Sequence, residues 1–250
     1  MMQPKAAIND FVIKFANVNG TGSASANGMF AKAIFRMGIP VSPRNIFPSN
    51  IQGLPTWYEV RISQDGYLGR RGGIDMMVSV NPQSFAKDVG EVEPGGYMLY
   101  DSTKPLDLRH VRRDIHYLGI PLTEMCLREY TDSRQRQLFK NVIYVGALSA
   151  LLNIDFSILK DLVSEQFKGK EKLITPNIHA LEMGHQYAST HFECPLGIHL
   201  KAGEQTPKHI QEFDQILMDG NTATALGAVY AGATVAAWYP ITPSTSVVDA

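Results

Sequence analysis

Short apolar runs typical of strands alternate, in the first half of the chain, with segments that have the 3.6-residue period of a helix. The predicted strands cover residues 9–18, 57–62, 76–80, 97–100 and 115–118. Residues 23–37 and 82–89 predict helices between them, and Gly38 and Pro40 are expected to end the first. The stretch 42–55, rich in Pro and Asn, is expected to be irregular. Because strands and helices alternate, the sequence predicts an α/β fold.

From residue 122 to about residue 188 the pattern is helical. Residues 141–152 (NVIYVGALSALL) are apolar on almost every side, which predicts a buried helix. Two further helices are expected to follow, the first with Asp155 as its N-cap. The second would have Thr175 as its N-cap and Pro176 at its first helical position.

The chain is expected to contain one domain and the beginning of another. Residues 193–208 combine Gly, Pro and charge without periodicity, which predicts a linker. Beyond it, the sequence predicts a helix of small residues at 222–231 and a short strand at 234–238. One or two strands are too few to enclose a core. The predicted division is a domain at 1–192, a linker at 193–208 and the start of a second α/β domain at 209–250.

Composition argues against several classes of function. The 23 Lys and Arg residues balance 24 Asp and Glu residues, so no excess positive charge is present to bind nucleic acid. No apolar run approaches the roughly 20 residues that span a bilayer, and no export signal is recognisable, so we expect a cytoplasmic protein without a membrane partner. Cys126 and Cys194 cannot supply four thiolates to an iron–sulfur cluster, and the seven histidines show no paired metal-ligand spacing. We therefore expect no metal site within this chain.

A glycine-containing turn joins the first predicted strand to the first helix. Backbone N–H groups and the helix dipole at such a turn attract phosphate. The candidate binding residues are Gly20, Thr21, Gly22, Ser23 and Ser25. The match to GxGxxG is partial, since Ser25 replaces the third glycine, and no ribose-binding acid follows, which argues against ordinary NAD binding. In the alternative interpretation, Ser23 caps the helix and no ligand binds.

Arg70 and Arg71 form a second candidate, because glycines flank them on both sides. Glycines allow a close approach of the backbone to a ligand, and guanidinium groups bind anions bidentately, as a coenzyme phosphate would require. The alternative, which the residues alone favour, is a hairpin loop whose arginines face water.

The third candidate is the double-proline segment 239–245 (YPITPST). Its prolines fix the backbone, and its hydroxyls would lie near a helix start at the carboxyl end of a strand, where α/β proteins commonly bind ligands. A ligand-free alternative is an N-cap at Thr242 with Pro243 at the first helical position. The residues alone do not decide between the two.

Residues 218–246 (MDGNTATALGAVYAGATVAAWYPITPSTS) closely resemble the start of the pyrimidine-binding domain of pyruvate and 2-oxoglutarate:ferredoxin oxidoreductases. Residues 9–188 more loosely resemble the gamma domain of these enzymes, with 70–73 and 140–154 as the best anchors. The resemblance implies a Rossmann-like gamma domain followed by the start of a thiamine-diphosphate pyrimidine-binding α/β domain. This is the order of the fused large subunit.

The resemblance implies that the chain is part of a coenzyme A-acylating enzyme, with 2-oxoglutarate as the favoured substrate. Thiamine diphosphate with Mg²⁺ and a [4Fe-4S] cluster would be held mainly by a beta subunit, ferredoxin would accept electrons, and the complex would be a dimer of heterodimers. The implied thiamine-pocket residues are Tyr239, Pro240, Ile241, Ser244 and Thr245. Thr242 would donate a hydrogen bond to the substrate, and the turn at 20–25 with Arg70 and Arg71 would contact coenzyme A phosphates.

Two departures from the family accompany this resemblance. NGTGSAS occurs where the family has a GGQG-like loop, and the glutamate that activates thiamine is expected after Ala250, so these 250 residues alone are expected to be inactive. One competing hypothesis is a non-catalytic domain that bridges subunits. Another is a free-standing nucleotide-binding oxidoreductase, against which the missing third glycine and the YPITPST segment argue.

Overall fold

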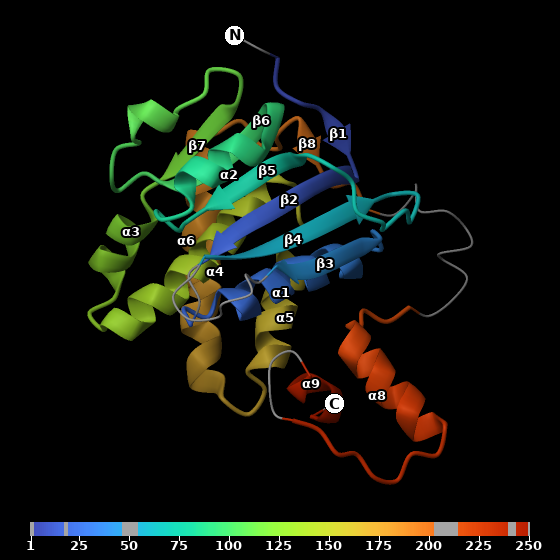
Figure 1. Ribbon diagram of the computed structural model, residues 1–250. Coiled ribbons are helices and arrows are strands. Elements are labelled where there is room, and N and C mark those ends of the chain that lie inside the picture. Colours follow the sequence, from blue (N-terminus) through green and yellow to red (C-terminus); the bar gives the residue numbers. More distant parts are fainter. Residues whose placement is uncertain (1–2, 18–19, 47–54, 203–214, 240–243, 250) are drawn as a thin grey trace. The chain divides into compact units, whose positions relative to one another are not determined.

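The computed structural model describes residues 3–17, 20–46, 55–202, 215–239 and 244–249 (Figure 1). Contacts divide the chain into two units, Met1–Gln211 and Glu212–Ala250. The first unit contains a six-stranded mixed sheet with helices on both faces, which confirms the α/β class. No helix within the described ranges combines the length and apolar character needed to cross a membrane.

The sheet of the first unit has the strand order β3-β4-β2-β5-β6-β7. Its strands are β2 (Asp10–Asn17), β3 (Val41–Ile46), β4 (Thr56–Ser63), β5 (Ile74–Ser79), β6 (Val92–Asp101) and β7 (His116–Ile120). Strands β2, β5, β6 and β7 are parallel, whereas β4 runs antiparallel to β2 and to the edge strand β3. The loops that follow β2, β5 and β6 therefore meet at one edge of the sheet.

Alternating side chains along β2 give each face of the sheet its own core. Phe11, Ile13 and Phe15 belong to a large buried cluster, while Val12 and Ala16 belong to a smaller one. The large cluster is covered by α1 (Ser23–Arg36), α3 (Leu122–Glu129), α4 (Ser133–Leu151), α5 (Phe156–Gln166) and α6 (Ile174–His191). Helix α2 (Phe85–Glu91) packs on the opposite face (Figure 1). Two short 3-10 turns, η1 (Leu108–His110) and η2 (Glu171–Leu173), lie in connecting segments.

Helices α4 and α6 approach each other unusually closely through two glycines. A Cβ atom added to Gly184 would lie 1.9 Å from the carbonyl oxygen of Ile143, and one added to Gly146 would lie 2.0 Å from that of Leu181. No other residue type fits this contact without moving a backbone. The predicted buried helix is confirmed, because every residue from 141 to 151 of α4 is buried.

Some local expectations were wrong for physical reasons that the structure shows. The stretch expected to be irregular contains β3, in which Pro43 is tolerated because the strand lies at the edge of the sheet. The described first part of the segment expected as a linker, 193–208, packs against the first unit. Leu196, Ile198 and Leu200 are buried in the main core, and β8 (Ile198–His199) pairs with β1 (Ala7–Ile8).

The predicted helix starts are partly confirmed. Asp155 caps α5 by accepting a hydrogen bond from the Ser157 backbone N–H at 2.9 Å. By contrast, α6 begins one residue before Thr175, with Leu173 at the capping position, so the expected cap at Thr175 was wrong. The first helix covers nearly the predicted range, and Gly38 after it adopts a positive φ of 77°.

The second unit contains α8 (Gly220–Tyr230) and α9 (Thr245–Val248). Asp219 caps α8 through the Thr222 backbone N–H at 2.9 Å. The strand expected at 234–238 is not formed, because a strand needs a hydrogen-bonded partner and none lies beside it among the described residues. None of the described residues of this unit is buried, so they enclose no core of their own.

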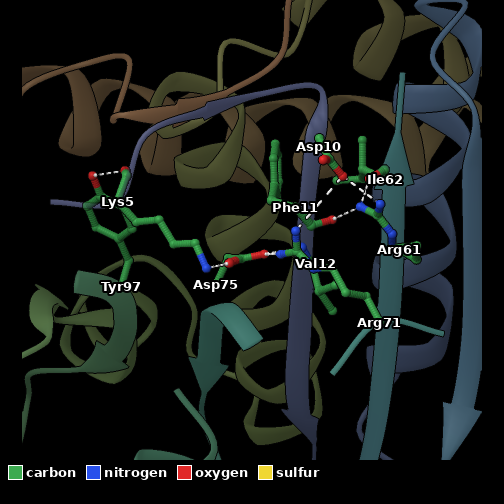
Figure 2. Close-up of polar contacts among 9 residues, drawn as sticks. All are labelled: Lys5, Asp10, Phe11, Val12, Arg61, Ile62, Arg71, Asp75 and Tyr97. Atoms are coloured by element: carbon green, nitrogen blue, oxygen red, sulfur yellow. Dashed lines mark hydrogen bonds and ion pairs between the residues drawn. The ribbon is translucent and has the colours of Figure 1, made fainter. Parts of the chain in front are cut away.

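A buried carboxylate joins several segments at the amino end of β5. The side chain of Asp75 is fully buried, accepts the Val12 backbone N–H at 2.7 Å and pairs with both Lys5 and Arg71 (Figure 2). Arg71 also lies 4.0 Å from Asp10 at the start of β2. The charge of Asp75 is thus compensated by an N-terminal lysine and by an arginine that precedes β5, which fixes both segments to the sheet.

We expect Gly184→Ala to lower the free energy of unfolding by about 1–3 kcal/mol, because α4 and α6 must separate to admit the methyl group. Urea unfolding of the full chain measures this. Gly28→Ala is the matched control, since nothing lies within 4 Å of a Cβ at that helical position. The control should be unchanged or more stable by about 0.5–1 kcal/mol. Equal midpoints for Gly184→Ala and the wild type would contradict the close helix contact.

We expect Arg71→Ala to lower the free energy of unfolding by about 1–2 kcal/mol, because the buried Asp75 carboxylate loses a charged partner. The neighbouring Arg70 is exposed, so Arg70→Ala serves as a control with the same change of charge and little expected effect. Thermal unfolding monitored by circular dichroism compares the two variants. Equal loss of stability in both would show that the ion pair with Asp75 contributes nothing.

Candidate functional site

A cavity of about 710 Å³ lies at the sheet edge where the loops after β2, β5 and β6 meet. Thr21 follows β2, Asn81 follows β5, and Thr103 and Lys104 follow β6. Helix α4 closes another side of the cavity with Lys140 and its neighbours. This volume is typical of small-molecule and cofactor sites, and the carboxyl edge of parallel strands is where α/β proteins commonly bind ligands.

Asp101, the last residue of β6, is the centre of a polar network in the cavity wall. Its Oδ1 accepts the Thr103 hydroxyl at 2.7 Å, the Thr103 backbone N–H at 3.2 Å and the Thr123 backbone N–H at 3.2 Å. Its Oδ2 accepts hydrogen bonds from the Thr123 hydroxyl and, at 3.3 Å, from the Lys140 ammonium. Burial on its own would raise the pKa of Asp101, but the threonine hydrogen bonds and the Lys140 charge outweigh it and hold this pKa below its ordinary value.

Helix α4 also holds the turn that follows β2. The Asn141 side-chain amide donates a hydrogen bond to the Thr21 carbonyl at 2.7 Å, and the Tyr144 hydroxyl donates to Asn27 in α1 at 2.7 Å. Tyr144 is fully buried, and burial raises the pKa of its hydroxyl above the ordinary value. The turn is therefore fixed against the same helix that carries Lys140.

The structure separates the five candidate residues of this turn. Thr21 lines the cavity, whereas Ser25 is exposed and its hydroxyl accepts a hydrogen bond from Gln166 at the end of α5. Gly20 and Gly22 both have a φ of 79°, a left-handed conformation that glycine adopts without strain. Gly22 is the N-cap of α1 and Ser23 is its first helical residue, so the alternative interpretation, in which Ser23 caps the helix, was wrong.

Arg70 and Arg71 lie at the edge of the sheet where β5 begins, opposite to the edge that carries the cavity. They precede β5, while the cavity is lined by Ser79 at the opposite end of that strand. Six residues of strand span about 20 Å, so one phosphate group cannot contact both Arg71 and Thr21. Arg71 instead pairs with the buried Asp75, and Arg70 is exposed. The structure therefore does not bring the two candidate phosphate sites together.

A fully buried acid of α2, Asp88, lies in the wall of the cavity that β5 and α2 form. Asp88 accepts hydrogen bonds from Trp57, Ser79 and Ser84, each at 2.8 Å. Burial raises the pKa of Asp88 by more than these neutral donors lower it. Because Ser79 also lines the cavity, this acid fixes one of its walls.

No sequence pattern indicated the Asp88 network, but one was present for Asp101. Asp101 directly follows the strand predicted at 97–100, and polar residues after parallel strands are candidates for a ligand site. Lys140 is the last charged residue before the apolar stretch of α4, and this position at the boundary of a buried segment was the available hint. Neither residue was among the candidates.

The double-proline segment belongs to the second unit. Tyr239 is 78% exposed, and its carbonyl accepts the Ser244 hydroxyl at 3.1 Å. Thr245 begins α9. Three of the candidates, Pro240, Ile241 and Thr242, lie outside the described residues.

The cysteines and histidines form no metal centre in the described ranges. No group of three or more His, Cys, Asp or Glu side chains there is placed to hold a metal ion. Cys126 is buried, and burial raises the pKa of its thiol to about 11, so it is neither an accessible ligand nor a reactive thiolate.

Comparison with known proteins places the chain in a family. The model of the family described as "Pyruvate ferredoxin/flavodoxin oxidoreductase" matches residues 12–187. The alpha subunit of 2-oxoacid:ferredoxin oxidoreductase 2 from Aeropyrum pernix is 25% identical over 94% of this chain and 42% of its own. The 2-oxoglutarate oxidoreductase subunit KorA from Mycobacterium tuberculosis is 23% identical over 96% of this chain and 40% of its own.

Solved structures agree with this result. The 2-oxoglutarate:ferredoxin oxidoreductase from Magnetococcus marinus, solved with 2-oxoglutarate, coenzyme A and succinyl-CoA bound, matches with a TM-score of 0.81 and 26% identity. That match covers 96% of this chain and 40% of the other. The pyruvate oxidoreductase subunit PORC from Thermotoga maritima shares the fold of 71% of the chain, with a TM-score of 0.57 and 21% identity.

The chain thus spans about two fifths of the length of the Aeropyrum pernix, Mycobacterium tuberculosis and Magnetococcus marinus proteins. The family model covers most of the first unit, including β5, β6, most of β2 and the helix that carries Lys140. The resemblance expected from the sequence is confirmed, and the chain belongs to the pyruvate ferredoxin/flavodoxin oxidoreductase family.

Proposed function

We propose that the chain is part of a 2-oxoacid:ferredoxin oxidoreductase that acts on 2-oxoglutarate and that its first unit binds coenzyme A in the cavity at the carboxyl edge of the sheet. The observation that carries the proposal is this cavity, within a unit that matches the family over residues 12–187. The related enzyme from Magnetococcus marinus was solved with 2-oxoglutarate and coenzyme A. The same class of ligand suits the cavity by size and position.

The lining of the cavity has the mixed character that coenzyme A requires. Apolar surface from Phe85, Pro105 and Leu106 suits the pantetheine arm, while Lys104 and Lys140 supply positive charge for phosphate groups. The turn at Thr21 adds backbone groups at the start of α1. We propose that the coenzyme A-handling unit extends to about residue 200, because β8 completes it.

Thiamine diphosphate, when bound with Mg²⁺, supplies the ylid that decarboxylates a 2-oxoacid. The second unit would contribute residues from its double-proline segment to that site, as the sequence resemblance implies. These are Tyr239, Pro240, Ile241, Thr242, Ser244 and Thr245. A beta subunit would hold most of the cofactor and a [4Fe-4S] cluster that reduces ferredoxin, in a dimer of heterodimers.

A non-catalytic role in subunit assembly is the second candidate function. An assembly domain needs an exposed contact surface, whereas the first unit has a concave site with a hydrogen-bonded acid and lysine in its wall. This difference favours ligand binding.

We expect the full chain to bind coenzyme A, as measured by isothermal titration calorimetry. Ala86 is exposed on α2 and lines the cavity, so Ala86→Trp fills the site without entering the core. A steric clash of about 1–3 kcal/mol would weaken binding about 5- to 150-fold. Arg70→Ala and Arg71→Ala should leave the affinity unchanged, since both side chains lie at the other sheet edge. No heat of binding to the wild type would remove coenzyme A from the proposal.

We expect Thr242→Ala to reduce kcat/KM for 2-oxoglutarate in the assembled enzyme about 10- to 100-fold, the effect of losing one hydrogen bond to a charged group. The comparison requires the beta subunit and ferredoxin in a steady-state assay. Thr224→Ala is a suitable control, because its hydroxyl donates to the Gly220 carbonyl within α8. Unchanged turnover and KM in Thr242→Ala would exclude a role for this hydroxyl in substrate binding.

A further inference from the structure

Lys140 differs from Lys104, the other lysine that lines the cavity, in how it is held. Its ammonium lies 3.3 Å from Asp101 Oδ2 and donates to the Thr123 hydroxyl at 3.0 Å. The lysine side chain is 28% exposed and the Asp101 side chain 17%. Lys104, by contrast, is exposed on the loop after β6. A charge fixed in a partly desolvated wall interacts more strongly with a ligand than a charge on an exposed, flexible stem.

The network leaves Lys140 with capacity to bind a ligand. An ammonium group has three N–H donors, and the two contacts with Asp101 and Thr123 account for two of them. The carboxylate of Asp101 is turned to protein donors, because Thr103 and Thr123 each contribute a backbone N–H and a hydroxyl. Asp101 therefore fixes the lysine and is itself satisfied by protein groups.

Helix packing restricts the position of Lys140 further. The residue lies one position before Asn141, which is bound to the Thr21 carbonyl, and six before Gly146, where α4 contacts α6. Neither the helix nor the turn can shift without breaking these contacts. The ammonium is thus held within the cavity wall by both its side-chain partners and its backbone.

We infer that Lys140 is the residue that binds a phosphate group of the cavity's ligand, and that Thr123 and Asp101 are positioning residues for its ammonium. The identity of the ligand as coenzyme A rests on the proposed function. The recognition of a phosphate or pyrophosphate by a fixed ammonium group does not depend on that identity.

The test uses the full chain and three probes: coenzyme A, inorganic pyrophosphate and pantetheine, which lacks phosphate. Lys140→Met should weaken coenzyme A and pyrophosphate binding about 10- to 100-fold and leave pantetheine binding unchanged. Lys168→Met is the matched control, because Lys168 is exposed after α5 and the same charge is removed. Calorimetry measures the first two probes, and ligand-observed NMR measures pantetheine.

Two further variants separate recognition from folding. Lys140→Arg keeps the charge and should retain binding of coenzyme A within about 10-fold of wild type. Thr123→Val removes the hydroxyl that contacts both Lys140 and Asp101 without changing net charge, and should weaken coenzyme A roughly 3- to 10-fold with pantetheine unaffected. Thermal midpoints confirm that each variant is folded. A variant that merely damaged the cavity would lose pantetheine as well, which would overturn the inference.

The outcomes for the two proposals are distinguishable. If the wild type binds coenzyme A and Lys140→Met binds it equally well, the inference about Lys140 fails and the proposed function stands. If the wild type binds pyrophosphate but not coenzyme A, and Lys140→Met loses pyrophosphate, the inference stands and the proposed ligand is wrong. If neither coenzyme A nor pyrophosphate binds the wild type, both are overturned.

Discussion

The parallel alignment of β2, β5 and β6 is the constraint on which the candidate site depends. Because these strands end at the same edge, the turn at Thr21, the loop at Asn81 and the acid at Asp101 are brought together from distant parts of the chain. The same alignment places the segment before β5 at the opposite edge of the sheet, where the parallel strands begin. Arg71 therefore pairs with the buried Asp75 (Figure 2). The length of β5 separates it from the cavity.

Helix α4 connects the packing of the core with the chemistry of the cavity. Its carboxyl-terminal half contacts α6 through Gly146, where a single methyl group would meet a backbone oxygen. Its middle carries Lys140 and Asn141, which contact Asp101 and the turn at Thr21. A helix whose backbone is fixed by close packing presents its polar side chains at fixed positions. Core and site are therefore not independent in this fold.

The sequence predicted the elements that have strong local patterns and missed those that depend on distant neighbours. The apolar runs of β2 and β5 and the stripe of α1 are local, and all three were predicted within a few residues. The strand β3 contains Pro43 and exists because β4 lies beside it, and the expected strand at 234–238 has no such neighbour in the described part of the chain. Periodicity carries no information about either circumstance.

The same reasoning explains why the candidate site was predicted only in part. Thr21 was found because a glycine turn before a helix is a local signal. Thr123 lies 22 residues after Asp101 in the sequence, and Lys140 lies 17 residues after Thr123. The path of the chain through β7 and α3 brings the three side chains together. The two arginines were chosen for their glycine neighbours, which describe a loop and say nothing about the edge of the sheet at which the loop lies.

Two acids beside the cavity, the half-buried Asp101 and the buried Asp88, respond to pH in opposite directions. The pKa of Asp101 is lower in the folded chain than in the unfolded chain, so the Asp101 carboxylate is protonated first in the unfolded chain as pH falls. The stability that Asp101 contributes is therefore present above its unfolded pKa and is lost as pH falls through its folded pKa. The pKa of Asp88 is raised, so its folded form retains a proton to higher pH, and stability falls as pH rises from the unfolded to the folded pKa. Asp101 is compensated by an ammonium, whereas Asp88 has only neutral donors. The wall formed by β6 and α4 therefore contains an acid–lysine pair, and the Asp88 network in the wall formed by β5 and α2 contributes no cation.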